Sequence, residues 1–531
     1  MAAAELDVLV VGAGFAGLYM VHRARGLGLS VEAVDAADGV GGTWWWNRYP
    51  GARCDVPSLE YSYGFDDDLQ QEWEWTERYA TQPEILSYLE HVADRFELRS
   101  HLTLGTRIDR LSFDEDELRW RIHLDDGSAR SARFVVMATG CLSAANMPDI
   151  AGADDFAGRT FHTGRWPHDP VDFAGRRVAV IGTGSSGVQS IPIIAQQAAH
   201  LTVFQRTPAY AVPAHNGPLH PADVAEIKAD YRNWRAVARD SRPGYGGHVP
   251  RPELSALSVS DEERSAAYDA RWEHGGLLFL GAFNDLLLNA EANDTAADYL
   301  RARIAQVVDD PATAEMLSPD TIVGCKRLCL DSGYFTTYNR DDVDLVDISA
   351  SPIDRIEAGG IVVDDRLHEV DDIVFATGFD AMTGALDRIH IEGRDGRTLR
   401  DAWAAGPTTL LGLQVAGFPN LFTVTGPGSP SVLTNMVSSI EHHVDWIADM
   451  LASMTTQGRT TVEATEAAQQ EWVAWVNAVA DLTLFPSCNS WYLGANVPGK
   501  PRVFMPLPGF PDYVAHCTTV AESDYPGFIF G

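Results

Sequence analysis

Two glycine-rich turns constrain the fold of this chain more than any other feature of its sequence. The first, Gly12-Ala13-Gly14-Phe15-Ala16-Gly17, follows the apolar run 7–11, and the second, Gly182-Thr183-Gly184-Ser185-Ser186-Gly187, follows the run 177–181. Glycines at these spacings permit a tight turn, close approach of a pyrophosphate and close packing of the next helix, whose N-terminus attracts negative charge. The sequence therefore predicts an α/β fold with two dinucleotide-binding, Rossmann-like domains.

The residues after the second strand of each unit indicate which nucleotide it binds. In the first unit, Asp35 ends the run 30–35 and is placed to bond the ribose hydroxyls of a dinucleotide. In the second unit, Gln205, Arg206 and Thr207 stand at the corresponding place. A guanidinium and a hydroxyl suit the additional 2′-phosphate of NADP, whereas a carboxylate there would repel it. We therefore predict FAD in the first unit and NADPH in the second; a unit that binds nothing is the alternative.

Two further strand-like runs place the domain boundaries. The runs 134–140 and 373–378 both end in Thr-Gly and look like the strands by which a chain leaves and re-enters the FAD domain of flavoproteins with two dinucleotide sites. We predict an FAD domain of residues 1–141 and 380–531 and an NADPH domain of residues 142–379. Within the NADPH domain, about 213–320 is rich in Ala, Glu, Arg and Leu at helical spacing, which predicts a helical insertion.

The charge and hydropathy of the chain exclude two classes of partner. With 74 acidic against 40 basic residues, the formal net charge is −34, which repels nucleic acid and anionic membranes. No segment approaches the ~20 consecutive apolar residues that a membrane helix needs. We therefore expect neither nucleic acid nor a membrane as a partner, and any site for anionic NADPH must gather Arg and Lys side chains locally.

The six cysteines indicate a reducing environment. They are sparse for 531 residues and show no metal-site spacing, so we expect a cytoplasmic protein without a metal site. The first seven residues have neither the basic region nor the apolar core of an export signal, which agrees with that expectation. Cys325 and Cys329 could pair as a redox couple, but two packed thiols are the favoured interpretation.

A chain that holds FAD and NADPH could be a disulfide reductase or one of several flavin-dependent monooxygenases. A disulfide reductase needs a redox-active cysteine pair soon after the FAD motif, where this chain has only Cys54. Composition does not separate the remaining classes, so the choice depends on motifs between the two nucleotide turns.

Those motifs resemble the type I Baeyer-Villiger monooxygenases. The segment 156–167 matches their fingerprint FxGxxxHxxxWP, with Phe156, Gly158, His162, Trp166 and Pro167 in register. A second signature of the family is complete at 41–55, and the likeness continues through 324–327, 435–436 and 489–496. The chain looks most like the phenylacetone and steroid monooxygenase group, which favours aryl, bulky or long ketones.

The resemblance implies a reaction and an oligomeric state. NADPH reduces FAD, O2 then gives a C4a-peroxyflavin, and this attacks a ketone to produce an ester or lactone, NADP+ and water. Sulfoxidation is compatible as a side activity. The alternative is an N- or S-oxygenating flavin monooxygenase, which uses the same cofactors. A monomer is expected.

The resemblance also assigns roles to individual residues. Arg327 is the expected catalytic cation, because an arginine keeps its charge at any working pH, and Asp55 is its orienting partner. His162 and Trp166 are expected at the hinge between the nucleotide domains, and Trp491 on a mobile loop that closes over the nicotinamide. Residues expected beside FAD, in addition to the first glycine turn and Asp35, are Gly42, Thr43, Trp44, Trp45, Asp55, Tyr61, Ile108 and Met436. Residues expected beside NADP, in addition to the second turn, are Arg206, Thr207, Lys326, Arg327 and Trp491.

The pocket for the ketone is expected to include Leu433, Met436 and Cys141. Three positions depart from the usual pattern of the family: Trp45 replaces a tyrosine, Pro57 a frequent glutamate and Cys141 a glutamine found in some relatives. Because these departures touch the shape of the pocket, they put the identity of the substrate in doubt rather than the reaction.

Overall fold

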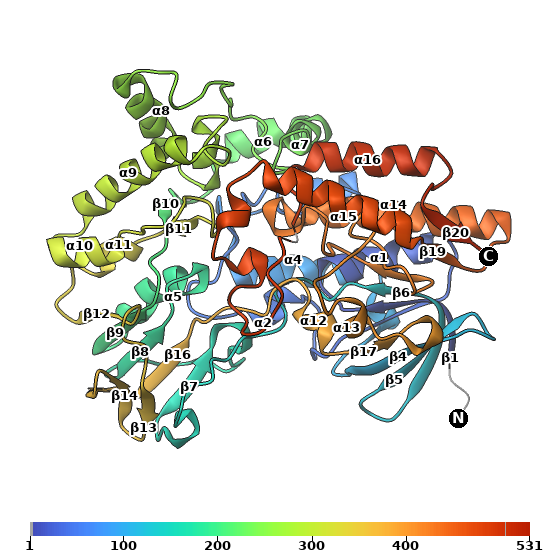
Figure 1. The fold of residues 1–531 in the computed structure, drawn as a ribbon, viewed down its shortest axis with the longest axis horizontal. Coiled ribbons are helices and arrows are strands. Elements are labelled where there is room, and N and C mark those ends of the chain that lie inside the picture. Colours follow the sequence, from blue (N-terminus) through green and yellow to red (C-terminus); the bar gives the residue numbers. More distant parts are fainter. Residues whose placement is uncertain (1–3, 505) are drawn as a thin grey trace.

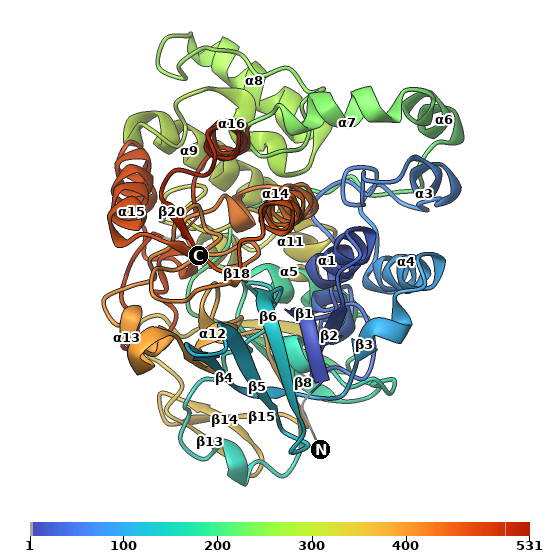
Figure 2. The same ribbon diagram turned by 90° about the vertical axis from the view of Figure 1, so that its right-hand side faces the viewer.

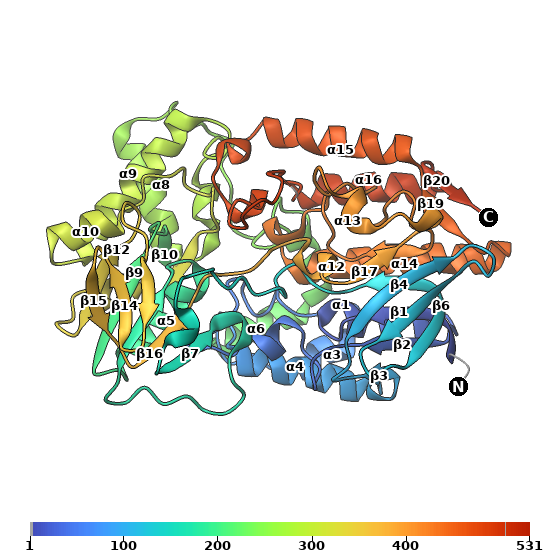
Figure 3. The ribbon, with the colours of Figure 1, turned by 60° about the horizontal axis from the view of Figure 1, so that its bottom comes forward.

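Two sheets built mainly on parallel strands form the frame of the computed structural model, which describes residues 4–504 and 506–531. Figures 1 and 3 show the sheets at opposite ends of the molecule. The first sheet has the order β17-β4-β5-β6-β1-β2-β3, with β18 paired to β6. Its strands are β1 (Ala4–Val11), β2 (Val31–Val34), β3 (Leu102–Thr103), β4 (Ile108–Asp114), β5 (Arg119–Leu124), β6 (Ala129–Met137), β17 (His390–Glu392) and β18 (Leu421–Thr423).

The second sheet has the order β12-β9-β8-β16-β7, and all of its pairings are parallel. Its strands are β7 (Arg159–His162), β8 (Arg177–Ile181), β9 (His200–Gln205), β12 (Val343–Asp347) and β16 (Asp372–Phe375). Near-continuous burial of β8, β9 and β16 is typical of parallel strands that are covered on both faces. The prediction of an α/β fold with two Rossmann-like units is confirmed.

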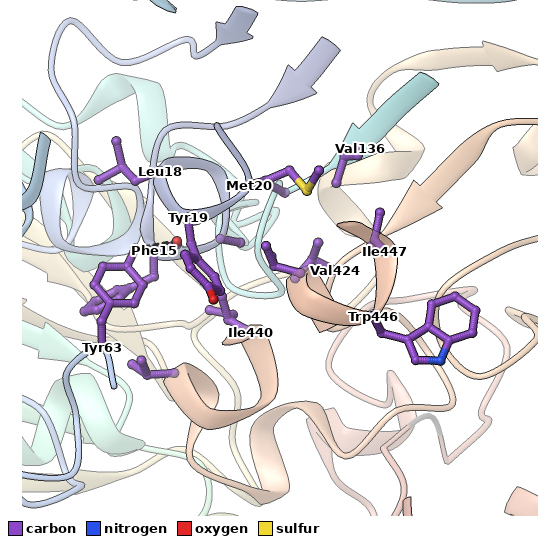
Figure 4. Packing of buried hydrophobic residues seen from close by; sticks show 14 of the residues in the cluster. Phe15, Leu18, Tyr19, Met20, Tyr63, Val136, Val424, Ile440, Trp446 and Ile447 are labelled. Atoms are coloured by element: carbon purple, nitrogen blue, oxygen red, sulfur yellow. Dashed lines mark hydrogen bonds between the residues drawn. The ribbon is translucent and has the colours of Figure 1, made fainter. Parts of the chain in front are cut away.

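The predicted re-entry of the chain into the first sheet brings distant segments together. β17 and β18 join the first sheet, and three long helices follow them, α14 (Met436–Gln457), α15 (Glu466–Asp481) and α16 (Phe510–Glu522). Figure 2 shows α14 beside α1 (Phe15–Gly26), with α4 (Gln82–Arg95) on the other side of α1. Figure 4 shows the core at this contact, where the aromatic rings of Phe15, Tyr19 and Tyr63 lie near Ile440.

Helices occupy the region that the sequence predicts as a helical insertion. They are α6 (Pro221–Ala229), α7 (Tyr231–Arg239), α8 (Asp261–His274), α9 (Ala290–Val307) and α10 (Pro311–Leu317), drawn in green to yellow in Figure 1. α8 begins with a capping box, in which the Ser260 side chain accepts the Glu263 N–H and the Glu263 side chain accepts the Ser260 N–H. Buried Arg235 of α7 donates to the Ser62 carbonyl over 2.8 Å, which fastens the insertion to the first domain.

Shorter elements connect these parts. They are α2 (Thr43–Trp46), α3 (Asp67–Glu72), α5 (Ser185–Ala195), α11 (Tyr334–Thr337), α12 (Gly384–Asp387), α13 (Leu399–Ala402), β10 (Ala211–Pro213), β11 (Cys329–Asp331), β13 (Arg355–Glu357), β14 (Gly360–Val363), β15 (Arg366–Glu369), β19 (Val462–Ala464) and β20 (Phe528–Phe530). Within 4–504 and 506–531, no helix is long and apolar enough to cross a membrane, and no cluster of three or more His, Cys, Asp or Glu could hold a metal ion.

Candidate active site

The first glycine turn has a backbone conformation and close backbone contacts that only glycine permits. Gly12 has a φ of 113°, and a Cβ there would lie 2.5 Å from the Ala138 carbonyl oxygen. The α1 helix starts directly after Gly14, and no side chain in the described part of the chain caps that end. Both oxygens of Asp35 accept backbone N–H groups, from Ala13 over 2.6 Å and from Ala37 over 2.8 Å, so its carboxylate is fixed beside the turn. The turn therefore fits a pyrophosphate and the carboxylate a ribose.

The second glycine turn repeats this geometry at the second sheet. Gly182 has a φ of 107°, and a Cβ there would lie 2.6 Å from the Ala376 carbonyl oxygen. Gly184 faces open space, and α5 begins at Ser185 with no side-chain cap on Gly184 among the described residues. The unbonded N–H groups of a helix start and an open approach are what a dinucleotide phosphate requires.

Two cations gather beside the second turn. Burial lowers the pKa of Lys326, and the positive charge of Arg206 acts in the same direction. Arg206 is exposed directly after β9, and the Thr183 hydroxyl donates to the Thr207 carbonyl over 3.0 Å, which holds residue 207 against the turn. In a chain of net charge −34, this local positive charge suits a phosphate.

Arg327 and Asp55 form a two-point ion pair although 272 residues separate them. The Arg327 Nε donates to Asp55 Oδ2 over 2.6 Å and its Nη2 to Oδ1 over 2.8 Å, while Nη1 donates to the Val432 carbonyl over 2.7 Å. Burial opposes the positive charge, but the Asp55 carboxylate outweighs it and raises the pKa of Arg327 well above its ordinary value. The guanidinium is thus a permanently charged group in a fixed orientation.

The residues expected around the ketone come together from distant parts of the chain. Cys141 lies in a buried cluster with Val432, Tyr492 and the disulfide-bonded pair Cys325 and Cys488. Leu433, Met436 and Trp491 are half-buried and pack against that cluster. Because Val432 also accepts from Arg327, the apolar cluster and the fixed cation are adjacent.

The chain is similar to known proteins along its whole length. It is 42% identical to a Baeyer-Villiger monooxygenase of Pseudooceanicola batsensis, over 99% of this chain and 96% of the relative. It is also 42% identical to a phenazine N-monooxygenase of Lysobacter antibioticus, over 99% of this chain and 97% of the relative. A solved structure of oxidized steroid monooxygenase bound to NADP is 55% identical, with 99% of both chains covered and a TM-score of 0.95. A family model described as pyridine nucleotide-disulphide oxidoreductase matches residues 9–232.

The chain belongs to the Baeyer-Villiger monooxygenase family. It is a flavin- and NADPH-dependent enzyme of the kind that converts a ketone to an ester or lactone. Solved structures of relatives contain FAD and NADP, so the predicted cofactors are confirmed together with the family.

In this monooxygenase, His162 lies where the chain crosses between the two sheets. Its Nδ1 accepts the Gly164 N–H over 2.9 Å, and Nε2 lies 3.2 Å from the Thr377 hydroxyl, which itself donates to the Asn146 carbonyl over 2.7 Å. Because Nδ1 accepts a hydrogen bond, the neutral ring carries its proton on Nε2, and burial lowers the pKa of His162, which favours this neutral form. The side chain thus links the end of β7 to Thr377, after β16, and through Thr377 to Asn146, between β6 and β7.

Trp166 lies in the core of the second domain of the monooxygenase. Its ring stacks on Phe161 at 5.2 Å and lies 6.2 Å from Phe173. The same buried cluster includes Tyr49 and Ala52 from the first domain. Trp166 therefore contributes to a core that the two domains share.

Four of the residues expected beside FAD, Gly42, Thr43, Trp44 and Tyr61, lie close to the first glycine turn or to the start of α1. A Cβ on Gly42 would lie 2.9 Å from the Gly14 Cα, so Gly42 and the following Thr43, at the start of α2, adjoin the first turn. Trp44 donates to the Tyr61 hydroxyl over 3.3 Å, and the Tyr61 ring lies 5.3 Å from the Phe15 ring.

Two other expected FAD residues have different surroundings. The Trp45 ring lies 4.7 Å from the ring of His168 and 5.2 Å from the Arg48 guanidinium, on the side of the second domain. Ile108 is buried in a cluster with Val11 and Val34, the last residues of β1 and β2.

The interpretation of the cysteines was wrong in one respect. Cys325 forms a disulfide with Cys488, with a Cα–Cα distance of 5.4 Å. Cys325 is therefore neither the redox partner of Cys329 nor a free packed thiol. Cys329 stays a buried thiol near the Ser185 hydroxyl, at 3.6 Å. A separation of 163 residues leaves no spacing signal for this bond, so the sequence did not reveal it.

Sequence reasoning also missed two tyrosines at the cation. Burial raises the pKa of Tyr492 to about 12, and the charge of Arg327 opposes that rise. Tyr245 is buried too, and Arg327 has the same opposing effect on its pKa. Tyr492 follows Trp491 in the family signature at 489–496, which was the available signal; Tyr245 belongs to the helical insertion and had none.

Proposed function

We propose that Arg327, oriented by Asp55, is the catalytic cation of this monooxygenase. The observation that carries this proposal is the two-point ion pair next to the apolar cluster that holds Cys141 and, at its edge, Leu433 and Met436. The bound flavin supplies the oxygen-transfer chemistry. The protein must then hold positive charge where negative charge develops, orient the ketone and keep water out.

The geometry lets Arg327 meet the first of these needs. Its Nε and Nη2 face Asp55 and its Nη1 faces Val432, so the guanidinium plane is fixed before a substrate arrives. A preorganised donor costs no reorganisation at the moment of reaction, which is why it stabilises a transition state better than mobile water does. The buried apolar side chains of the cluster exclude water from the same place.

The division of the cofactors between the domains is also a proposal. FAD would be held by residues 1–141 and 380–531, and NADPH by residues 142–379. In support, β17 and β18 pair with strands of the first sheet, whereas β7 and β16 pair within the second. Arg206, Thr207 and Lys326 would bind the 2′-phosphate, and Trp491 would cover the nicotinamide.

We propose a bulky or aryl ketone as the substrate, and a monomeric enzyme. The 55% identity to a steroid monooxygenase supports a large substrate, as does the apolar character of Leu433 and Met436. A panel of steroid, aryl, cyclic and linear ketones, assayed for NADPH consumption and for ester or lactone by mass spectrometry, tests this. Ester formation from small cyclic ketones alone would contradict it, and size-exclusion chromatography with light scattering tests the monomer.

The relative named a phenazine N-monooxygenase supports a second candidate function, oxygenation of an aromatic nitrogen. The electronic demand differs, because a ketone carbon accepts electrons whereas a nitrogen lone pair donates them. The same panel should therefore include phenazine and a thioether. N-oxide formation without any ester from the ketones would favour this second candidate.

A further inference from the structure

One covalent bond joins the two segments that flank the candidate active site. Cys325 immediately precedes Lys326 and Arg327, and Cys488 lies three residues before Trp491. Both cysteines are buried, with exposed fractions of 6% and 7%, and belong to the apolar cluster that includes Cys141. The bond therefore links the segment of the cation to the segment 488–501.

Near Trp491, segment 488–501 is also held by the packing of the buried side chains of Tyr492 and Leu493. Its far end is held by an ion pair between Lys500 and Asp380 and by a hydrogen bond from Asn496 to the Phe379 carbonyl over 2.6 Å. Both of these contacts reach residues 379 and 380, which follow β16, and neither reaches residue 327. Within the described residues, the cystine is the one covalent attachment of the segment outside its own backbone.

Two side chains that follow Cys488 closely in the sequence, those of Trp491 and Tyr492, lie near the candidate active site. The rings of Trp491 and Tyr492 lie 4.3 Å apart, and Tyr492 is buried with an exposed fraction of 2%. Tyr492 packs in the same buried cluster as Val432, whose carbonyl accepts from the Arg327 Nη1 over 2.7 Å, so the phenol lies on the side of the guanidinium. A phenol hydroxyl can accept from a guanidinium N–H, so Tyr492 is placed to help orient the cation.

We propose that the Cys325–Cys488 bond is a thiol-reducible tether that holds Trp491 and Tyr492 over Arg327. A dithiol opens it: one thiolate attacks a cystine sulfur and releases the first cysteine thiol, and the second thiolate then attacks the mixed disulfide and releases the other cysteine, so that the dithiol becomes a cyclic disulfide and the two cysteines gain two electrons and two protons. A small disulfide such as oxidised glutathione closes it again by the reverse exchange, with release of two glutathione thiols.

Opening the tether should lower the population of the closed segment without changing any residue that contacts NADP. The apparent affinity falls in proportion to the fraction of molecules in the binding-competent arrangement. If the free segment spends between a third and a tenth of its time closed, the apparent Kd for NADP+ rises about three- to tenfold. This inference rests on the proposed covering role of Trp491, but neither of its two tests depends on activity.

The first test counts thiols in the FAD-loaded enzyme prepared without reductant. Alkylation in denaturant should modify Cys54, Cys141, Cys329 and Cys517, and a peptide pair that joins Cys325 to Cys488 should appear in the mass spectrum. After dithiothreitol, all six cysteines should react. Six reactive thiols before reduction, with no decrease after incubation with oxidised glutathione, would overturn the proposal.

The second test compares the oxidised and reduced enzyme by chymotrypsin cleavage after Trp491 or Tyr492 and by titration with NADP+. Reduction should speed cleavage and raise the Kd about three- to tenfold. Cys488→Ser should behave like the reduced enzyme with or without dithiothreitol, whereas Cys517→Ser, at a buried position of α16, should keep the full response. Equal cleavage and equal Kd in the oxidised and reduced wild-type enzyme would refute the tether, whatever the enzyme's activity toward ketones.

Discussion

Replacing Arg327 with alanine should separate the NADPH-dependent half of the reaction from the oxygen-transfer half. Hydride transfer requires correct placement of NADPH, which the second glycine turn and the residues proposed to bind the 2′-phosphate, Arg206 and Lys326, should still provide in the variant. Oxygen transfer to a ketone develops negative charge at the reacting atoms, and the fixed guanidinium is the group proposed to stabilise it. The two halves should therefore respond differently to the same substitution.

The structure sets the size of the effect. Arg327 is oriented by two bonds of 2.6 and 2.8 Å to Asp55, and the exposed side-chain fractions of the pair are 21% and 24%. Loss of such a preorganised donor typically costs about 2.7 to 4 kcal/mol, or ~100- to 1000-fold in rate. Arg327→Lys should restore little, because an ammonium lacks the planar fork that both oxygens of Asp55 engage.

Anaerobic stopped-flow oxidation of one equivalent of NADPH measures the first half, and aerobic product analysis measures ester formation. Arg130→Ala is a matched control, since Arg130 donates to both oxygens of Glu32 over 2.8 and 3.1 Å with exposed side-chain fractions of 19% and 16%. Both substitutions leave a carboxylate unpaired, so a general loss of stability should affect both variants.

Ester formation by Arg327→Ala within about threefold of the wild-type rate would refute the assignment, since a threefold loss corresponds to less than 1 kcal/mol. An equal loss in Arg327→Ala and Arg130→Ala would also refute it, because the effect would then come from destabilisation. Loss of anaerobic NADPH oxidation in Arg327→Ala alone would place the residue in cofactor binding instead.

Two further predictions concern other charged groups. Arg206→Ala should reduce the preference for NADPH over NADH in kcat/KM by about 10- to 150-fold, the equivalent of 1.5 to 3 kcal/mol for a charged hydrogen bond, whereas Arg366→Ala should leave it unchanged. Equal use of both coenzymes by the wild-type enzyme would contradict the 2′-phosphate site. Burial raises the pKa of Glu60 from 4.5 to about 7, so its ionisation opposes folding from pH 4.5 upward and does so fully above pH 7. Glu60→Gln should therefore raise the free energy of unfolding by about 2 to 3 kcal/mol more at pH 8 than at pH 5, as measured by urea denaturation. A difference between Glu60→Gln and the wild-type enzyme that does not change with pH would contradict the burial argument.

The nucleotide-binding frame could be predicted because its signals are local. Each glycine turn needs its residues within six positions, and the structure shows why, since a Cβ at Gly12 or Gly182 would meet a carbonyl oxygen of the neighbouring strand end. The helical insertion was predictable for the same reason, because a period of 3.6 residues is visible in any window of the sequence. Its helices run from Pro221 to Leu317, inside the predicted range 213–320.

The surroundings of the cation could not be derived from local patterns. The Cys325–Cys488 bond spans 163 residues, and Tyr245, which lines one cavity with Asp55, comes from an insertion whose sequence shows only helical periodicity. Side-chain contacts of this kind depend on how the domains pack, and composition or spacing carries no record of that packing. The resemblance supplied Arg327 and Asp55 as a pair, but their mutual geometry required the structure.

The contacts of Arg327 explain how such a site can keep its chemistry while its substrate changes. The guanidinium is fixed by a carboxylate and by the main-chain carbonyl of Val432, so its position does not depend on the side chain at residue 432. The start of α14 is also fixed by other groups, because the Asn435 side chain donates to the Glu60 carbonyl over 2.7 Å and the Asn435 N–H to the Pro243 carbonyl over 2.8 Å. Leu433, Met436 and Cys141 can therefore vary in size without moving the cation. A substitution at these three positions should therefore change the preference among ketones more than it lowers the overall rate of ester formation.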